Sequence, residues 1–117
     1  MVMRTRTFAV VRHVQPGVSV IDIHGEMTAA SEKELMQAYA QVSAAQARTL
    51  ILNLGRLEYM NSGGIGLLVM LLVRAQRQGQ QVLTYGLNGH YRRLLELTRL
   101  NEAMQSFATE ADALAHA

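Results

Sequence analysis

One stretch of the sequence decides the fold: Tyr59-Met60-Asn61-Ser62-Gly63-Gly64-Ile65-Gly66-Leu67-Leu68. It follows an apolar run at residues 49–54, typical of a buried strand, and leads into one at residues 67–73 that favours a buried helix. A strand, a polar turn with small residues and a helix form half of a βαβ unit. Ser62 is therefore predicted at or near a helix N-terminus, where backbone N–H groups have no partner within the helix. That position suits a helix cap, and it also suits an anion or a phosphorylated hydroxyl.

The composition indicates a globular protein with one core. The chain has 117 residues, is 50% hydrophobic and carries a formal net charge of +2. We therefore expect one domain, residues 1–117, and no nucleic-acid partner. The absence of Cys excludes disulfides, thiolate catalysis and thiolate metal sites. The longest apolar run, residues 65–73, is too short to span a bilayer, and no segment resembles an export signal. These features predict a cytoplasmic protein without direct membrane insertion.

The rest of the chain alternates between strand and helix patterns. Strands at residues 7–14 and 18–23 flank the turn Gln15-Pro16-Gly17 and are expected to form a hairpin. Ser31 and Glu34 have the spacing of a capping box at the start of a helix. The following elements are a strand at 49–54, a helix at 62–78, a strand at 81–85, a helix at 89–98 capped by Asn88, a strand at 105–108 and a last helix capped by Thr109. The order β-β-α-β-α-β-α-β-α predicts an α/β fold with helices packed on a mixed central sheet.

The sequence carries no signature of catalysis or metal binding. Its four histidines have no metal-ligand spacing, and no Gly-x-Ser-x-Gly elbow occurs. The glycines at 63, 64 and 66 do not match either phosphate-binding loop, and Asp22 and Glu58 have no second carboxylate nearby in sequence. We therefore expect no enzyme, no cofactor and no metal ion, and we expect the function to reside in the surface of the domain.

Several segments together resemble the STAS domains, in particular the bacterial anti-sigma factor antagonists. The resemblance covers nearly the whole chain and is carried by Gly25-Glu26-Met27 and residues 50–54, 59–66 and 94–101. It implies a STAS fold that matches the predicted order. It also implies binding to an anti-sigma factor with a kinase-like ATPase fold, which frees a sigma factor. In the usual mechanism that partner phosphorylates a Ser in the turn before the second helix, which ejects the antagonist, and a phosphatase resets it.

The sequence departs from the family pattern at the phosphorylation site. The usual motif is Asp-Ser-Ser-Gly-x-Gly, whose second Ser receives the phosphate. Here Asn61 replaces the Asp, Ser62 matches the first Ser, and Gly63 occupies the acceptor position. Thr28 also stands where many relatives have an Asp. Either Ser62 accepts the phosphate one residue early, or the protein binds its partner without phosphorylation and Gly63 keeps the turn flexible. We prefer the second hypothesis, under which Gly63→Ser would restore control by the kinase.

The resemblance also suggests where a partner binds. We expect a partner-binding turn and a partner-binding loop, joined by the helix face around Arg74 and Arg77; the turn comprises Met60, Asn61, Ser62, Gly63 and Gly64, and the loop comprises Met27 and Thr28. Gly64→Arg should then abolish binding and leave the fold intact.

Other roles remain open. STAS-like domains also serve as subunits of transport or lipid-trafficking assemblies and as parts of stress-signalling scaffolds, and these roles need no acceptor Ser. A small-ligand-binding or enzymatic role is a third alternative, which a ligand that raises the melting temperature would reveal.

Overall fold

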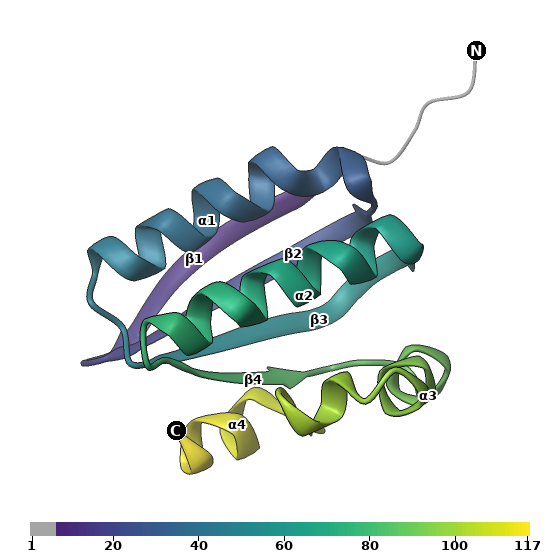
Figure 1. Ribbon diagram of the computed structural model, residues 1–117. Helices are drawn as coiled ribbons and strands as arrows, with labels where there is room; N and C mark the ends of the chain where they lie inside the picture. Colours follow the sequence, from purple (N-terminus) through teal and green to yellow (C-terminus); the bar gives the residue numbers. More distant parts are fainter. Residues whose placement is uncertain (1–6) are drawn as a thin grey trace.

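The computed structural model describes residues 7–117 and contains one five-stranded sheet with helices on both sides (Figure 1). The strands are β1 Phe8–Gln15, β2 Val18–Met27, β3 Thr49–Met60, β4 Gln81–Tyr85 and β5 Gln105–Phe107. The α-helices are α1 Glu32–Ala44, α2 Ser62–Arg77, α3 Gly89–Leu97 and α4 Glu110–His116, and the 3₁₀ turns are η1 Ala29–Ser31 and η2 Leu100–Glu102. The predicted fold class and order of elements are confirmed.

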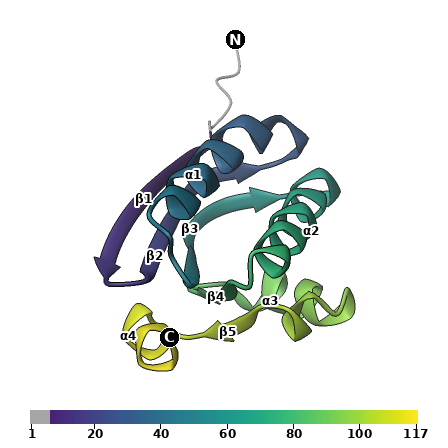
Figure 2. The ribbon, with the colours of Figure 1, turned by 60° about the vertical axis from the view of Figure 1, so that its left-hand side comes forward.

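The strands lie side by side in the order β1-β2-β3-β4-β5. β1 is antiparallel to β2, as the predicted hairpin requires, and the other neighbouring pairs are parallel. Because crossovers between parallel strands are right-handed, the successive connections through α1 and α2 place both helices on the same face. Figure 2 shows α1 and α2 together on that face and α4 on the opposite side of the sheet.

The two faces of the sheet bury different amounts of apolar surface. Leu50, Leu52 and Leu54 point toward α1 and α2 and form the main core with Leu35 and Leu68. The alternate residue Ile51 faces the other way and packs in a small cluster with Ala113 of α4. Each fully buried Leu or Ile contributes about 1.5–3 kcal/mol relative to an exposed one. α2 is therefore firmly fixed, whereas α4 rests on a small contact.

β3 is twice as long as its apolar run suggested. The sequence predicts a strand at 49–54 followed by a polar turn, but the strand continues to Met60. Two shifts in the register between β2 and β3 allow this, because each adds a residue to β3. Leu54, Leu57 and Met60 all face the core, and the two residues between each successive pair are exposed. In residues 55–60 the buried side chains recur every third residue and not every second one. The alternating pattern that marks a strand in a sequence is therefore missing from this half of β3.

The start of α1 also differs from the prediction. Ser31 and Glu34 do not form the expected capping box, because the Ser31 side chain makes no cap hydrogen bond to α1. A capping box forms one turn earlier, where Thr28 Oγ1 accepts from the Ala30 N–H and Ser31 Oγ accepts from the Thr28 N–H. The chain therefore enters α1 through η1, which lies beside the N-terminal end of α2.

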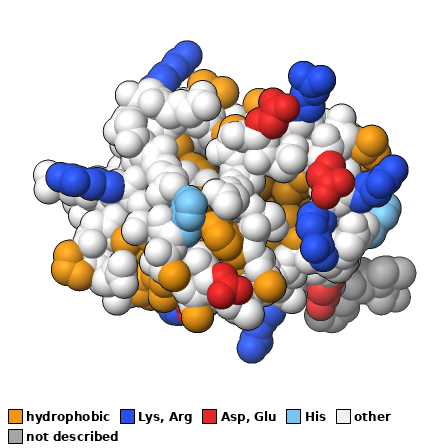
Figure 3. Space-filling view, turned by 90° about the horizontal axis from the view of Figure 1, so that it is seen from below, with side chains coloured by type: hydrophobic (Ala, Val, Ile, Leu, Met, Phe, Trp, Pro, Cys, Tyr) orange, Lys and Arg blue, Asp and Glu red, His pale blue; other side chains and the backbone are white. Residues whose placement is uncertain are grey.

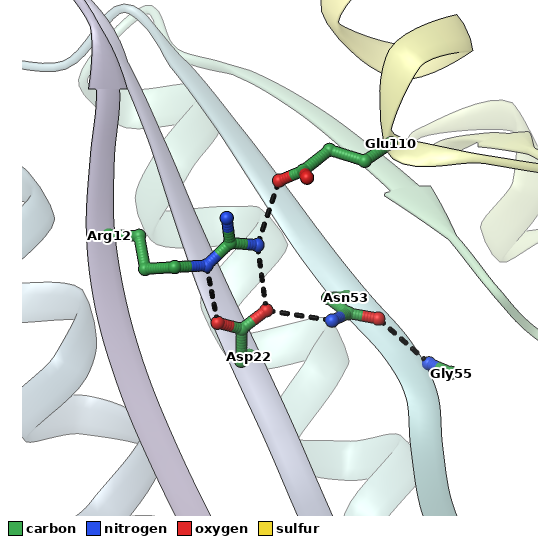
Figure 4. Close-up of polar contacts among 5 residues, drawn as sticks. All are labelled: Arg12, Asp22, Asn53, Gly55 and Glu110. Carbon is green, nitrogen blue, oxygen red and sulfur yellow. Dashed lines mark hydrogen bonds and ion pairs between the residues drawn. The ribbon is translucent and has the colours of Figure 1, made fainter.

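A polar network fixes α4 to the sheet (Figure 4). The Arg12 guanidinium donates to both carboxylate oxygens of Asp22, at 2.6 and 3.0 Å, and to Glu110 of α4 at 2.7 Å. Asn53 Nδ2 donates to Asp22 Oδ1 at 2.7 Å, and Asn53 Oδ1 accepts from the Gly55 N–H. Burial by itself would raise the pKa of Asp22, but the hydrogen bonds from Arg12 and Asn53 outweigh burial and lower it. The network therefore favours the ionised form of Asp22.

We predict that Asp22→Asn lowers the free energy of unfolding at pH 7 by about 1–3 kcal/mol, because the buried acceptor loses its charge. Because the pKa of Asp22 is lower in the folded state, its contribution is complete above the unfolded-state value of about 3.9 and is lost as the pH falls below it. Urea unfolding at pH 7 and at pH 3 measures both effects.

The matched control is Asp112→Asn, which changes the exposed aspartate of α4. In this variant the free energy of unfolding should change between pH 7 and pH 3 by about as much as it does in the parent. If the free energy of unfolding depended on pH equally in the Asp22→Asn variant and in the parent, the role assigned to the network would be contradicted.

Candidate functional site

The predicted partner-binding turn and loop lie next to each other because β2 and β3 end together. Met27 pairs with Met60 at the last register position of the two parallel strands. Beyond it, the Asn61 N–H donates to the Met27 carbonyl at 3.3 Å. Tyr91 of α3 supports the same corner from the other side, since its hydroxyl accepts from the Met60 N–H at 3.1 Å. The loop after β2 and the N-terminus of α2 therefore form one continuous surface.

Asn61 is the N-cap of α2, and Ser62 is the first residue of the helix. The Asn61 side-chain oxygen accepts from the Gly64 N–H at 3.1 Å, which satisfies one of the donors left free at a helix start. Asn61 thus supplies the side-chain oxygen that an Asp would supply, without its charge. Ser62 is exposed at this corner. Its hydroxyl makes no hydrogen bond with any residue in the range 7–117.

Gly63 and Gly64 allow α2 to approach the loop very closely. A Cβ atom on Gly63 would lie 2.7 Å from the Ala29 backbone nitrogen, and one on Gly64 would lie 2.1 Å from the Met27 carbonyl oxygen. Neither distance is possible without moving backbone, so these glycines serve close packing. The expectation that Gly63 keeps the turn flexible is therefore wrong.

The same contacts overturn one expectation about a variant. Gly64→Arg cannot leave the fold intact, because even the first side-chain carbon would overlap the Met27 carbonyl. Gly63→Ser would displace η1 as well as add a hydroxyl, and its effect on control by a kinase stays a prediction.

Only part of the predicted turn and loop is accessible. The side chains of Met27 and Met60 are 0% and 5% exposed and belong to the main core, and Gly64 is buried as well. A partner could therefore contact Ser62, the edges of Asn61, Gly63 and Thr28, and the exposed residues Ala29 and Ala30. The methionines shape this surface from beneath.

α2 extends the accessible surface along its outer face. Ser62, Gly66, Val69 and Val73 follow one another at spacings of four, three and four residues, which places them on one side of a helix. Val69 and Val73 are 41% and 40% exposed, and no atom outside the helix lies within 4 Å of the position of a Cβ on Gly66. We call these four residues the α2 ridge. Arg74 and Arg77 follow in the last turn.

The structure offers little for metal chemistry. Within residues 7–117, no group of three His, Cys, Asp or Glu side chains could hold a metal ion. The side chains of His13 and Ser19 are hydrogen-bonded, with 2.8 Å between Nδ1 and Oγ. No helix in the described part of the chain has the length and apolar character needed to cross a bilayer.

Sequence reasoning missed the α2 ridge and the Asp22 network. Val69 and Val73 lie in an apolar run whose pattern predicts a buried helix, because a helix that is apolar nearly all round gives no sign of its outer face. Asp22 and Asn53 could have been paired, since each is a polar residue in an apolar strand and strands joined by a single helix are commonly neighbours, as these two are.

The fold and the sequence together identify the family. A family model described as "Mlab, STAS domain" matches residues 11–107. Because this match spans most of the chain, the protein belongs to the STAS domain family.

Solved structures agree with this assignment at the level of the fold. An anti-sigma factor antagonist from Mycobacterium paratuberculosis has 24% identity and a TM-score of 0.79, with 95% of this chain and 93% of that chain covered. The phosphorylated form of the Bacillus cell fate determinant SpoIIAA has 20% identity and a TM-score of 0.72, with 92% and 97% covered. A sulfate transporter family protein from Wolinella succinogenes has 19% identity and a TM-score of 0.77, with 90% and 88% covered. The protein is thus a STAS domain that shares its fold with anti-sigma factor antagonists and with a sulfate transporter family protein.

We predict opposite effects for two alanine substitutions in the first turns of α2. Gly64→Ala should lower the free energy of unfolding by about 1–3 kcal/mol or more, because the new methyl group overlaps the Met27 carbonyl. Gly66→Ala should raise it by about 0.5–1 kcal/mol, because the space is open and Ala is a better helix former. Urea unfolding of the two variants beside the parent tests the packing, and equal stability of the three proteins would contradict it.

Proposed function

We propose that this STAS domain is a non-enzymatic protein-interaction module that binds its partner through the α2 ridge and the exposed part of the adjoining loop. The observation that carries the proposal is the pair of exposed valines on the α2 ridge, Val69 and Val73, on the same side of the helix as Ser62. Exposed apolar side chains that lie together on a rigid element are typical of protein-binding surfaces. The main core holds α2 in place, so little ordering is needed before a partner binds.

The first candidate partner is an anti-sigma factor with a kinase-like ATPase fold. The resemblance of the chain to anti-sigma factor antagonists supports this choice. Binding would free a sigma factor, as the family pattern implies. We further propose that the usual phosphorylation switch is lost, because the acceptor position holds Gly63 and the Ala29 backbone occupies the space a side chain would need. Without that switch the protein binds whenever the partner is present, and a phosphatase has no role at position 63.

A second candidate role is that of a subunit in a transport assembly. The transporter assignment rests on one similar structure, that of a sulfate transporter family protein, and the matching family model is described only as "Mlab, STAS domain". Such a subunit needs a permanent docking surface and no phosphate acceptor, which suits the closed space at Gly63. Both candidates use the α2 ridge, and they differ in the partner that occupies it.

We predict that Val69→Glu abolishes capture of the partner, because a charge replaces an apolar contact at the centre of the α2 ridge. The tagged protein is used to capture proteins from its native host, which are identified by mass spectrometry. A small kinase-fold protein lost in the variant supports the first candidate. Transporter subunits lost in the variant support the second.

The matched control is Leu97→Glu, which places the same charge at an exposed apolar position of another helix, α3. It should capture the same proteins as the parent, and both variants should melt as cooperatively as the parent. Capture that survives Val69→Glu but fails with Leu97→Glu would move the interface to α3.

We predict that the captured partner and ATP add no phosphate to the chain, because position 63 has no hydroxyl and Ser62 lies one residue away from the family's acceptor. Intact-mass spectrometry of the parent and of Ser62→Ala measures this. A phosphate that appears on the parent and is missing from Ser62→Ala would show that Ser62 has become the acceptor. That result would overturn the proposed loss of the switch and leave the α2 ridge as the interface.

A further inference from the structure

A cleft on the opposite side of the sheet from the α2 ridge has features of a ligand site. It has a volume of about 570 Å³ and is lined by Phe8, His24, Gly25, Gly55, Arg56, Leu57 and Glu58. This volume lies within the range of about 300–1,000 Å³ that is usual for small-molecule sites. The cleft crosses β1, β2 and the bulged half of β3, on the face that carries α4. Figure 3 views the molecule from the side of α3 and α4 and shows hydrophobic side chains reaching the surface among charged ones.

The bulge in β3 brings two basic side chains together in this cleft. Asn53 pairs with Asp22, and Arg56 pairs with His24, so three residues of β3 span two of β2. In a regular strand Gly55 would lie opposite His24, and the Arg side chain would turn to the other face. Phe8 pairs with His24 from the other side. Neighbouring strands are about 4.8 Å apart, so Phe8, His24 and Arg56 form one row across the sheet.

The basic groups of this row are free to bind an anion. Within residues 7–117, neither the His24 ring nor the Arg56 guanidinium takes part in a side-chain hydrogen bond or ion pair. The neighbouring carboxylate of Asp22 already accepts from Arg12 and Asn53. One carboxylate, that of Glu58, also lines the cleft, beside one guanidinium and one imidazole that can donate hydrogen bonds.

An apolar surface adjoins the basic pair. Phe8 and Val10 are 57% and 53% exposed, and they are two residues apart on β1, so both side chains lie on the face of the cleft. An inorganic anion would leave this surface in water, and a neutral apolar molecule would leave the two basic groups unpaired. A molecule with both characters matches the cleft.

We propose that the cleft binds a small anionic amphiphile. Its carboxylate or phosphate group contacts His24 and Arg56, and its apolar part lies on Phe8 and Val10. This site is separate from the α2 ridge, so the proposal does not depend on the identity of the protein partner.

The test uses the full chain and three probes in amide-resolved NMR titrations: decanoate, decanol and inorganic phosphate. Decanoate should shift the signals of residues near Phe8, His24 and Arg56 and should bind more tightly than either other probe. Arg56→Gln and Phe8→Ala should each weaken decanoate binding about fivefold or more, because each removes one of the two contacts. The matched control Arg93→Gln changes an exposed Arg of α3 and should bind decanoate like the parent.

Four results would overturn the proposal. Phosphate that binds as tightly as decanoate would make the cleft a plain anion site, and decanol that binds as tightly would make it a plain apolar one. Equal weakening by Arg56→Gln and Arg93→Gln would show only a general effect of charge. A dimer in light scattering that Phe8→Ala converts to a monomer would assign the surface to a second copy of the chain. We expect Val69→Glu to bind decanoate like the parent, because Val69 lies on the α2 ridge and away from the cleft. This variant separates the test of the cleft from the test of the protein partner.

Discussion

The parallel pairing of β2 with β3 along their whole lengths is the interaction on which the rest of the structure depends. It begins at Val18 with Thr49 and ends at Met27 with Met60, and both strands are buried over most of that distance. Because the last residues of the two strands, Met27 and Met60, are paired with each other, the loop after β2 and the start of α2 leave the sheet at the same place. The Asn61 N–H then donates to the Met27 carbonyl, and Gly64 lies against that same carbonyl. Two segments far apart in sequence become one surface by this pairing.

This close approach gives a physical reason for the two adjacent glycines. The helix start can lie against η1 and the end of β2 only if positions 63 and 64 lack side chains, since either Cβ would overlap backbone atoms. Gly66, one turn further on, faces open space and is not required by packing. The absence of a side chain at position 63 permits the tight contact between α2 and η1. The glycine at position 63 is thus part of the architecture of the corner.

The two sides of the sheet perform different tasks in this molecule. On one side, the main core fixes α2 and presents an apolar ridge on a rigid support. On the other side, α4 covers only part of the sheet and is fastened by the Arg12 network, so the ends of β1, β2 and β3 remain open. The bulges of β3 serve both sides, because they keep Leu57 and Met60 in the core while they turn Arg56 and Glu58 outward.

The sequence by itself determined the fold class, the order of the elements, the hairpin and the caps at Asn88 and Thr109, because these follow from local periodicity and short-range hydrogen bonding. It also marked the stretch around Ser62 and its departure from the family motif. Only the tertiary structure decided that Met27 and Met60 are buried, that Gly63 and Gly64 are packing contacts, and that β3 extends through two bulges. It alone revealed which side of the apolar helix α2 is exposed and that Arg12, Asp22, Asn53 and Glu110 meet. These features arise from contacts between segments that are far apart in the sequence. A local sequence pattern does not encode how closely such segments approach each other in space.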